Sequence, residues 1–247
     1  MLDNINIVLS HTSHPGNIGA TARAMKTMGL AKLVLINPKK FPSAEATVRA
    51  TKADDVLENA KVVLTLDEAL KGCSLVIGTS ARSRALDAPL LTARELADKL
   101  VHEYQHENVA LLFGTESAGL TNEEVSRCHY HVYIPANPDY CSLNLASAVQ
   151  LISYELRVAF LDNPGINVGR KPRKAASTSV TAEQMEGFYQ HLEKTLIETG
   201  YYNPEHPKLL MSRLRRLYNR ARPDNSEMQI LRGILSSVQN GFKKDNL

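Results

Sequence analysis

Short apolar runs alternate with helical patterns through the first two thirds of the chain. Such runs are typical of strands buried on both faces of a sheet, and they cover residues 5–9, 33–36, 62–64, 75–77, 109–113 and 132–134. Helical spacing of apolar residues indicates helices over 19–28, 66–70, 93–104 and 143–161. The alternation predicts an α/β fold, a doubly wound parallel sheet with helices on both faces.

The pattern changes after Asp162. Residues 163–179 read NPGINVGRKPRKAASTS, a stretch of Gly, Pro and small polar residues with four positive charges and no negative one. The charges are those of Arg170, Lys171, Arg173 and Lys174. This composition predicts a flexible basic linker over 163–180.

The last part of the chain has the pattern of three amphipathic helices. The first begins near Thr181 in a capping-box pattern, and the second covers 209–220 with arginines on one side. The third begins with Ser226 as its expected N-cap, and its spacing predicts buried side chains at Ile230, Leu231, Ile234, Leu235 and Val238. We therefore predict an α/β domain (1–162), the linker, and a small all-helical domain (181–247).

The α/β part and the C-terminal part of the chain also differ in net charge. The net charge of +3 conceals 15 basic and 18 acidic residues up to Asp162, a net of −3, and 14 basic and 8 acidic residues after it, a net of +6. The 43% hydrophobic and 22% charged residues exclude a disordered or collagen-like chain. No apolar run is long enough for a membrane span, and the start lacks a signal-peptide pattern, so we expect a cytoplasmic protein that does not bind membranes.

The cysteines do not point to a disulfide framework or a metal site. Cys73, Cys128 and Cys141 are odd in number. Cys128, His129, His131 and Cys141 lack the paired spacing that zinc ligands show, so no metal is expected. We interpret these four residues as ordinary turn and strand residues.

Four polar segments directly follow predicted strands. They are residues 14–23 (HPGNIGATAR), 79–84 (TSARSR), 114–119 (GTESAG) and 134–146 (IPANPDYCSLNLA). Each alone has a simpler interpretation: a tight strand-to-helix turn, two solvated arginines, a solvated loop acid, and a helix N-cap at Ser142. Ligand sites of α/β sheets are built after strand ends, so the convergence of the four predicts a ligand site there.

Two familiar site classes do not fit these segments. The first loop has only two of the glycines of a dinucleotide fingerprint, and Asn37 follows the second strand where an acid would be needed. Thr115 stands where the hydrolase elbow G-x-S-x-G requires glycine. A dinucleotide-dependent enzyme is therefore disfavoured.

The strings PGNIGATARAMKTMGL, GTSARSR, LLFGTESAGLTNEE and IPANPDYCSLNLASAVQLISYE resemble, in order and spacing, the motifs of the SPOUT superfamily of RNA 2′-O-methyltransferases. The resemblance continues through HLEKTL and LRRLYNRARP in the tail. Within the superfamily the chain is most similar to enzymes that methylate the ribose of cytidine or uridine at nucleotide 32 of the tRNA anticodon loop.

The resemblance implies a SPOUT-type parallel sheet whose C-terminal part forms a trefoil knot holding S-adenosylmethionine. General topology rules disfavour knots, so that expectation comes from the family alone. The family also implies a homodimer, because its sites are assembled near the subunit interface.

Site residues carry over by motif. The family assigns the leading catalytic role to Arg23, which we expect to bind the adjoining phosphate and stabilise the developing oxyanion, since arginine is always protonated. Asn17 would orient Arg23, Glu116 would position Arg23 or the substrate by an ion pair, and Ser142 would hydrogen-bond the ribose or Arg23. The cofactor would be held by Thr79, Ser80, Ala81, Gly114, Ile134, Cys141, Ser142, Leu143 and Asn144. Cys141 departs from the serine common in this family, which puts its side-chain role in doubt but not a main-chain contact.

RNA contacts are expected from arginines beside the cofactor loop and in the basic tail: Arg82, Arg84, Arg213, Arg215, Arg216, Arg220 and Arg222, with the linker cations. Two other functions share most of these features. One is methylation of ribosomal RNA, which the helical tail disfavours, and the other is RNA binding without catalysis, which the retained Asn17, Arg23, Glu116, Ser142 and Asn144 disfavour.

Overall fold

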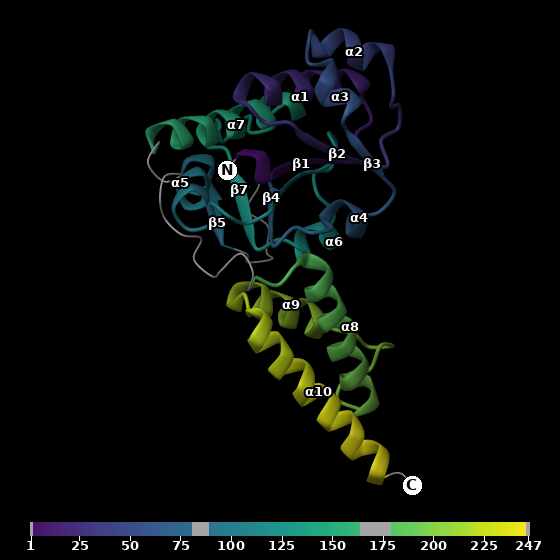
Figure 1. The fold of residues 1–247 in the computed structure, drawn as a ribbon. Coiled ribbons are helices and arrows are strands. Elements are labelled where there is room, and N and C mark those ends of the chain that lie inside the picture. Colours follow the sequence, from purple (N-terminus) through teal and green to yellow (C-terminus); the bar gives the residue numbers. More distant parts are fainter. Residues whose placement is uncertain (1, 81–88, 164–178, 246–247) are drawn as a thin grey trace.

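The computed structural model of the chain describes residues 2–80, 89–163 and 179–245, and its α/β unit is built on one parallel sheet (Figure 1). The strands are β1 (Ile5–Ser10), β2 (Lys32–Ile36), β3 (Lys61–Val63), β4 (Leu75–Thr79), β5 (Leu90–Thr92), β6 (Val109–Phe113) and β7 (Tyr130–Tyr133). They lie in the order β3-β2-β1-β6-β4-β7-β5, and every pairing is parallel.

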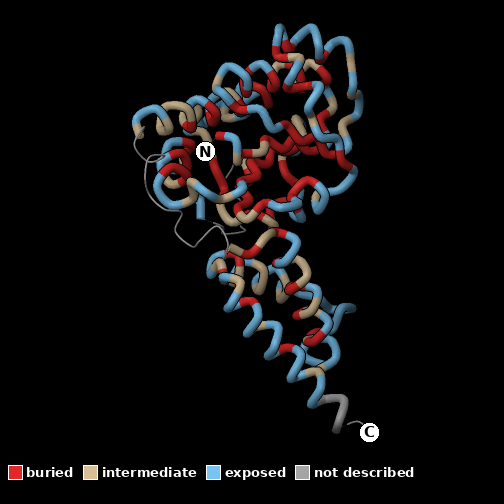
Figure 2. The backbone as a smooth tube through the Cα atoms, viewed as in Figure 1, coloured by how far each residue is buried: buried red, intermediate tan, exposed pale blue. Residues whose placement is uncertain are grey.

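Helices cover both faces of the sheet, as predicted. They are α1 (Pro15–Met28), α2 (Ala44–Ala50), α3 (Asp54–Glu58), α4 (Leu66–Leu70), α5 (Ala93–His102), α6 (Asn122–Ser126) and α7 (Leu145–Asp162), after a short 3-10 helix (Leu2–Asn4). Successive strand side chains point to opposite faces. Ile7 and Leu9 therefore join one core with α1, α5 and α7, while Val8 joins the other with α4 and α6. Figure 2 shows this buried interior along the sheet.

The apolar runs predicted six strands, and all six are present, five of them with boundaries shifted by one or two residues. The seventh, β5, is a short edge strand that pairs only with β7 among the described strands. Its first residue, Leu90, is exposed, so the strand carries no buried apolar run to reveal it. The trefoil knot is a property of the chain path rather than of strand order, and it stays a prediction.

The helical unit consists of α8 (Ala182–Glu198), α9 (Leu210–Ala221) and α10 (Asn225–Asp245), extending from one end of the α/β unit (Figure 1). Phe188 and Leu192 of α8 pack against Met228 and Leu235 of α10. The predicted capping box at Thr181 is confirmed. No helix among the described residues is long and apolar enough to cross a bilayer.

Two predictions about α10 are wrong. Ile230, Ile234 and Val238 are exposed, by 64%, 55% and 36%, because the stripe of Met228 and Leu235 faces α8 instead. The N-cap contacts belong to Asp224 rather than to Ser226. Asp224 Oδ1 accepts from the backbone amide of Glu227 at 2.8 Å, and the backbone amide of Asp224 donates to Glu227 Oε2, also at 2.8 Å.

The helical unit docks directly on the α/β unit. The Ala182 amide donates to the Cys73 carbonyl at 2.8 Å, and the Asn219 side chain donates to the Ser126 carbonyl at 3.1 Å. Cys73 precedes β4 and Ser126 precedes β7. The docking contacts therefore lie at the amino ends of the strands.

Ion pairs reinforce this docking. Glu186 of α8 binds Arg215 of α9 at 2.7 Å and lies 3.4 Å from Arg127, which in turn pairs with Asp67 of α4 at 2.7 Å. Arg222 stacks over Tyr104 and lies 3.7 Å from Glu107. Charge thus bridges the two units on both sides of α9.

Candidate active site

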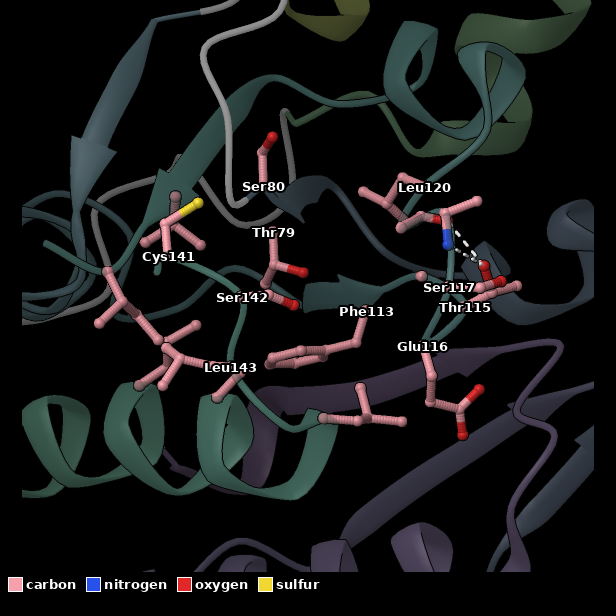
Figure 3. Close-up of a pocket in the computed structure, with 18 residues that line it drawn as sticks. Thr79, Ser80, Phe113, Thr115, Glu116, Ser117, Leu120, Cys141, Ser142 and Leu143 are labelled. Carbon is pink, nitrogen blue, oxygen red and sulfur yellow. Dashed lines mark hydrogen bonds between the residues drawn. The ribbon is translucent and has the colours of Figure 1, made fainter. Parts of the chain in front are cut away.

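A cavity of about 390 Å³ opens at the carboxyl ends of β4, β6 and β7. It falls in the size range of small-molecule sites. In Figure 3 Ser142 and Leu143 lie on one side and the loop from Thr115 to Leu120 on the other, with Thr79 between them. Of the predicted cofactor residues, seven line it: Thr79, Ser80, Gly114, Ile134, Cys141, Ser142 and Leu143. Ala81 lies outside the described residues.

Gly114 shows why the sequence needs glycine after β6. A Cβ built there would stand 2.0 Å from the Gly119 carbonyl carbon and 2.2 Å from the Leu120 nitrogen. The loop closes on itself at this point, because Thr115 and Gly119 exchange backbone hydrogen bonds of 3.1 and 2.9 Å. A side chain at Gly114 would overlap these backbone atoms, so the loop would have to move.

The apolar wall of the cavity was missed by sequence reasoning. Leu145, Ala148 and Ile152 line it from α7, and Phe113 and Val132 from the strands. The α7 residues recur at helical spacing and carried a signal, but the pattern predicted only core packing. Their arrangement suits a ligand with a flat apolar group.

The start of α7 corrects one expectation. Ser142 is exposed at the cavity rim and does not cap the helix. Asn144 is the N-cap, and its side-chain oxygen accepts from the Ala146 and Ser147 amides at 3.0 and 3.4 Å. The hydroxyl of Ser142 therefore stays available to a ligand.

Glu116 is the hub of a hydrogen-bond network beside the cavity. Its carboxylate accepts from the Ser13 amide (3.2 Å), the Ser13 hydroxyl (2.9 Å), the His14 amide (3.3 Å) and the Asn17 amide group (3.0 Å). The expected ion pair with Arg23 is absent among the contacts of the described residues. Glu116 instead ties the start of α1 to the cavity loop.

Asn17 extends this network to α7. Its side-chain oxygen accepts from the Asn144 side chain at 3.0 Å while its nitrogen donates to Glu116. Both of its polar atoms are thereby engaged, and no contact between Asn17 and Arg23 is seen among the described residues. The expected orientation of Arg23 by Asn17 stays a prediction. The row of Glu116, Asn17 and Asn144 holds three site segments in fixed relation.

The network also sets the ionisation of Glu116. Partial burial would raise the pKa of this carboxyl, but the hydrogen bonds from Asn17 and Ser13 outweigh burial and lower the pKa to about 2. Glu116 is thus ionised near neutral pH and weakly basic. Its carboxylate is held in place by hydrogen bonds from Ser13, His14 and Asn17.

We expect Glu116→Gln to lower the free energy of unfolding at neutral pH by about 1 kcal/mol, because one charged acceptor is lost. The folded-state pKa lies below the ordinary value of 4.5, so this stabilisation is present above pH 4.5 and is lost as the pH falls toward about 2. Denaturant titrations across that range measure it. Glu123→Gln, at an exposed position of α6, is the control. A difference from wild type that is independent of pH would contradict the assignment.

Arg23 lies on α1 with its side chain exposed and outside the cavity lining. The structure therefore leaves its guanidinium accessible to a large substrate. Arg82 and Arg84, with the linker cations Arg170, Lys171, Arg173 and Lys174, lie outside the described residues.

The tail arginines divide into two groups. Arg215 makes a two-bond ion pair with Glu186, each bond 2.7 Å, and stacks on the Tyr189 ring at 4.4 Å. Arg222 is held against Glu107 and Tyr104. The side chains of these two arginines are engaged within the protein, and Arg213, Arg216 and Arg220 lie at exposed positions. The RNA-binding role expected of all five stays a prediction.

Metal ligation has no support in the described residues, which contain no cluster of three His, Cys, Asp or Glu side chains suited to an ion. Cys128 is buried, and its thiol donates to the Glu124 carbonyl at 3.2 Å. His129 accepts from the Val76 amide at 3.1 Å. Both residues have structural roles.

Two family models match the chain. Residues 4–154 match the SpoU rRNA Methylase family, and residues 183–246 match the tRNA methyltransferase TrmJ, C-terminal domain. The first match covers the α/β unit with its cavity, and the second covers the helical unit. The class of protein that the fold and cavity define is therefore a SpoU-type methylase.

Relatives extend the match over both units. The chain is 55% identical to the tRNA (cytidine/uridine-2′-O-)-methyltransferase TrmJ of Pectobacterium atrosepticum over 97% of this chain and 98% of the relative. It is 54% identical to the tRNA (cytidine/uridine/adenosine-2′-O-)-methyltransferase TrmJ of Pseudomonas aeruginosa, over 97% and 95%. The crystal structure of TrmJ from Z. mobilis superposes with a TM-score of 0.81 at 32% identity, covering 95% of this chain and 98% of that one. The chain belongs to the SpoU methylase family, in its TrmJ branch.

A shorter relative matches about two thirds of the chain. The structure of a probable methyltransferase from Bordetella pertussis Tohama I covers 64% of this chain and 96% of its own length, at 42% identity and a TM-score of 0.59.

Proposed function

We propose that this chain transfers a methyl group from S-adenosylmethionine to the ribose 2′-OH of cytidine or uridine at nucleotide 32 of the tRNA anticodon loop. The observation that carries the proposal is the joint placement of a SpoU-type cavity and a helical unit of the TrmJ type in one chain. Membership of the TrmJ branch makes the chain a tRNA 2′-O-methyltransferase, and nucleotide 32 is the finer part of the proposal.

The cavity residues fit the cofactor. Gly114 leaves room for a close backbone approach, and the wall of Leu145, Ala148 and Ile152 suits an adenine ring. Thr79, Ser80, Ile134, Cys141 and Leu143 would contact it from the strand ends and the segment before α7. When bound, S-adenosylmethionine supplies an electrophilic methyl group on a sulfonium.

The protein's part in the reaction is placement and charge. A ribose 2′-OH is a poor nucleophile, and in-line placement can contribute about 7–11 kcal/mol to the rate. Ser142, exposed at the rim, would hold the ribose, and Arg23 would bind the adjoining phosphate and stabilise the developing oxyanion. Asn17, Asn144 and Glu116 would keep these segments in register through their hydrogen bonds.

We further propose a homodimer that forms through α7. Leu151, Tyr154 and Leu161 are exposed by 41%, 50% and 55% on one side of this helix, and Tyr140 is 80% exposed beside the cavity. Contiguous exposed apolar side chains of this kind are typical of surfaces that contact another protein. Because α7 also lines the cavity, a dimer formed through this helix would place the site near the subunit interface, as the family resemblance implies.

The division into a catalytic domain (1–162), a linker (163–180) and a tRNA-binding domain (181–247) is also a proposal. The separate family-model matches over residues 4–154 and 183–246 support it. The contacts of Ala182 and Asn219 with the α/β unit mean that the two domains meet directly.

Ribosomal RNA methylation is the second candidate, since the matching α/β family is described for rRNA. The TrmJ-type helical unit favours tRNA. A third candidate, RNA binding without catalysis, would leave the hydrogen-bond network of Glu116 and Asn17 without a role in a reaction.

The test is mass-spectrometric mapping of ribose methylation in tRNA from cells with and without the gene. We expect one methyl group to disappear, at nucleotide 32, and to return with the plasmid-borne gene. Unchanged tRNA with a methyl group lost from ribosomal RNA would support the second candidate instead.

A further inference from the structure

A second cavity, of about 190 Å³, lies between the two units. One wall comes from α6 and the segment before β7, and the other from α9. Its polar lining includes Asn122, Ser126, His129, Ser212, Arg216 and Arg220. We refer to it as the interdomain cleft. At about 30 Å³ per water molecule it has room for a group such as a phosphodiester, though not for a duplex.

The lining of the interdomain cleft is basic and contains no acid among the residues that the structure describes. Arg220 is exposed and makes no ion pair with a described residue. This distinguishes it from Arg215 and Arg222, whose charges are met by Glu186 and Glu107. The cleft therefore has positive charge available for an anion.

His129 adds a fixed hydrogen-bond donor. Its Nδ1 accepts from the Val76 amide at 3.1 Å, and burial, with the charge of Arg222, lowers the pKa of the ring to about 3. The ring is thus neutral, and its proton must reside on Nε2. The guanidinium of Arg220 adds further donors to the lining, which favours a ligand rich in acceptor oxygens.

The two walls are held together by satisfied contacts. Asn219 donates to the Ser126 carbonyl at 3.1 Å and accepts from the Tyr189 hydroxyl at 2.8 Å. Asn219 is itself buried, with 8% exposed. The cleft is therefore a property of the docked pair of units, and neither unit forms it alone.

We propose that the interdomain cleft binds a backbone phosphodiester of the tRNA, away from the nucleotide that is methylated. This inference rests on the proposed function. The cofactor cavity lies at the carboxyl ends of the strands and the cleft at their amino ends, so a five-residue strand of about 17 Å separates them. A phosphate in the cleft belongs to a different part of the RNA and contributes affinity rather than base choice.

Two substitutions test the cleft from opposite walls. Arg220→Ala removes a cation from α9, and Asn122→Asp adds an anion at the first position of α6, where an acid is compatible with the helix. We expect each to weaken binding of a tRNA transcript about tenfold at moderate salt. For Arg220→Ala we also expect the slope of log affinity against log salt to fall by about one.

Matched controls carry the same charge changes away from the cleft. Arg232→Ala and Gln229→Glu alter exposed positions of α10 that do not line it, and should change affinity less than about threefold. Cofactor affinity by calorimetry and thermal unfolding check that the cleft variants are folded.

If the cleft variants bind tRNA as their controls do while the wild-type protein still methylates tRNA, the cleft assignment is wrong and the proposed function stands. If the wild-type protein methylates no tRNA, the proposed function has failed independently. Weakening of tRNA binding by a cleft variant together with lost cofactor affinity would also overturn the assignment, because it would reveal a fold-wide effect.

Discussion

Gly114→Ala is expected to abolish cofactor binding. The added Cβ would stand 2.0 Å from the Gly119 carbonyl carbon and 2.2 Å from the Leu120 nitrogen, far inside van der Waals contact. These are backbone atoms of a loop closed by its own hydrogen bonds, so no side chain can rotate to relieve the overlap. We expect no cofactor binding by calorimetry and a loss of about 3 kcal/mol in the free energy of unfolding.

Gly187→Ala is the matched control, because a Cβ there meets no atom within 4 Å. It lies inside α8, where alanine is favoured over glycine by about 0.5–1 kcal/mol, so stability should rise slightly and cofactor affinity should not change. Normal cofactor affinity in Gly114→Ala would show that the loop can open without cost and that glycine is not required there.

Arg23→Ala is expected to bind the cofactor normally and to lose methyl transfer by about 10²- to 10³-fold. The side chain is exposed on α1 and outside the cavity lining, so its removal leaves the cofactor contacts in place. Its permanent charge would act on the phosphate and the developing oxyanion. Single-turnover methylation at saturating tRNA separates this loss from weaker RNA binding.

Two further variants interpret the result. Arg49→Ala removes an exposed arginine from α2 and should retain wild-type turnover. Arg23→Lys keeps the charge but not the planar guanidinium, so partial rescue would assign the role to charge and no rescue to two-bond geometry. Wild-type single-turnover rates in Arg23→Ala would remove Arg23 from the mechanism.

Much of the fold followed from local pattern. The run at 109–113 predicted β6 with its correct bounds, because a strand buried on both faces is apolar at every position. The pattern did not predict β5, because Leu90 is exposed and this segment is a strand only through its pairing with β7. On α10 two apolar stripes compete, and the position of α8 decides that Met228 and Leu235 are covered while Ile230 and Ile234 are not.

The candidate site divides in the same way. The motif residues Gly114, Ser142 and Thr79 line one cavity, because parallel strands end at the same edge. The partners of Glu116 could not be foreseen, since Ser13 and Asn17 lie about a hundred positions away in the chain. Arg215 and Arg216 are neighbours in sequence, yet only the position of Glu186 makes the first a structural residue.

The sequence by itself therefore determined six of the seven described strands, the longer helices, the two-part charge distribution and the segments that meet at the cavity, because these depend on periodicity, composition and local motifs. The tertiary structure alone decided which polar groups meet across the chain, which face of α10 is covered, and that a basic cleft exists between the two units. These depend on packing between distant segments, where a rotation of one helix exchanges an exposed side chain for a buried one without any change in local pattern.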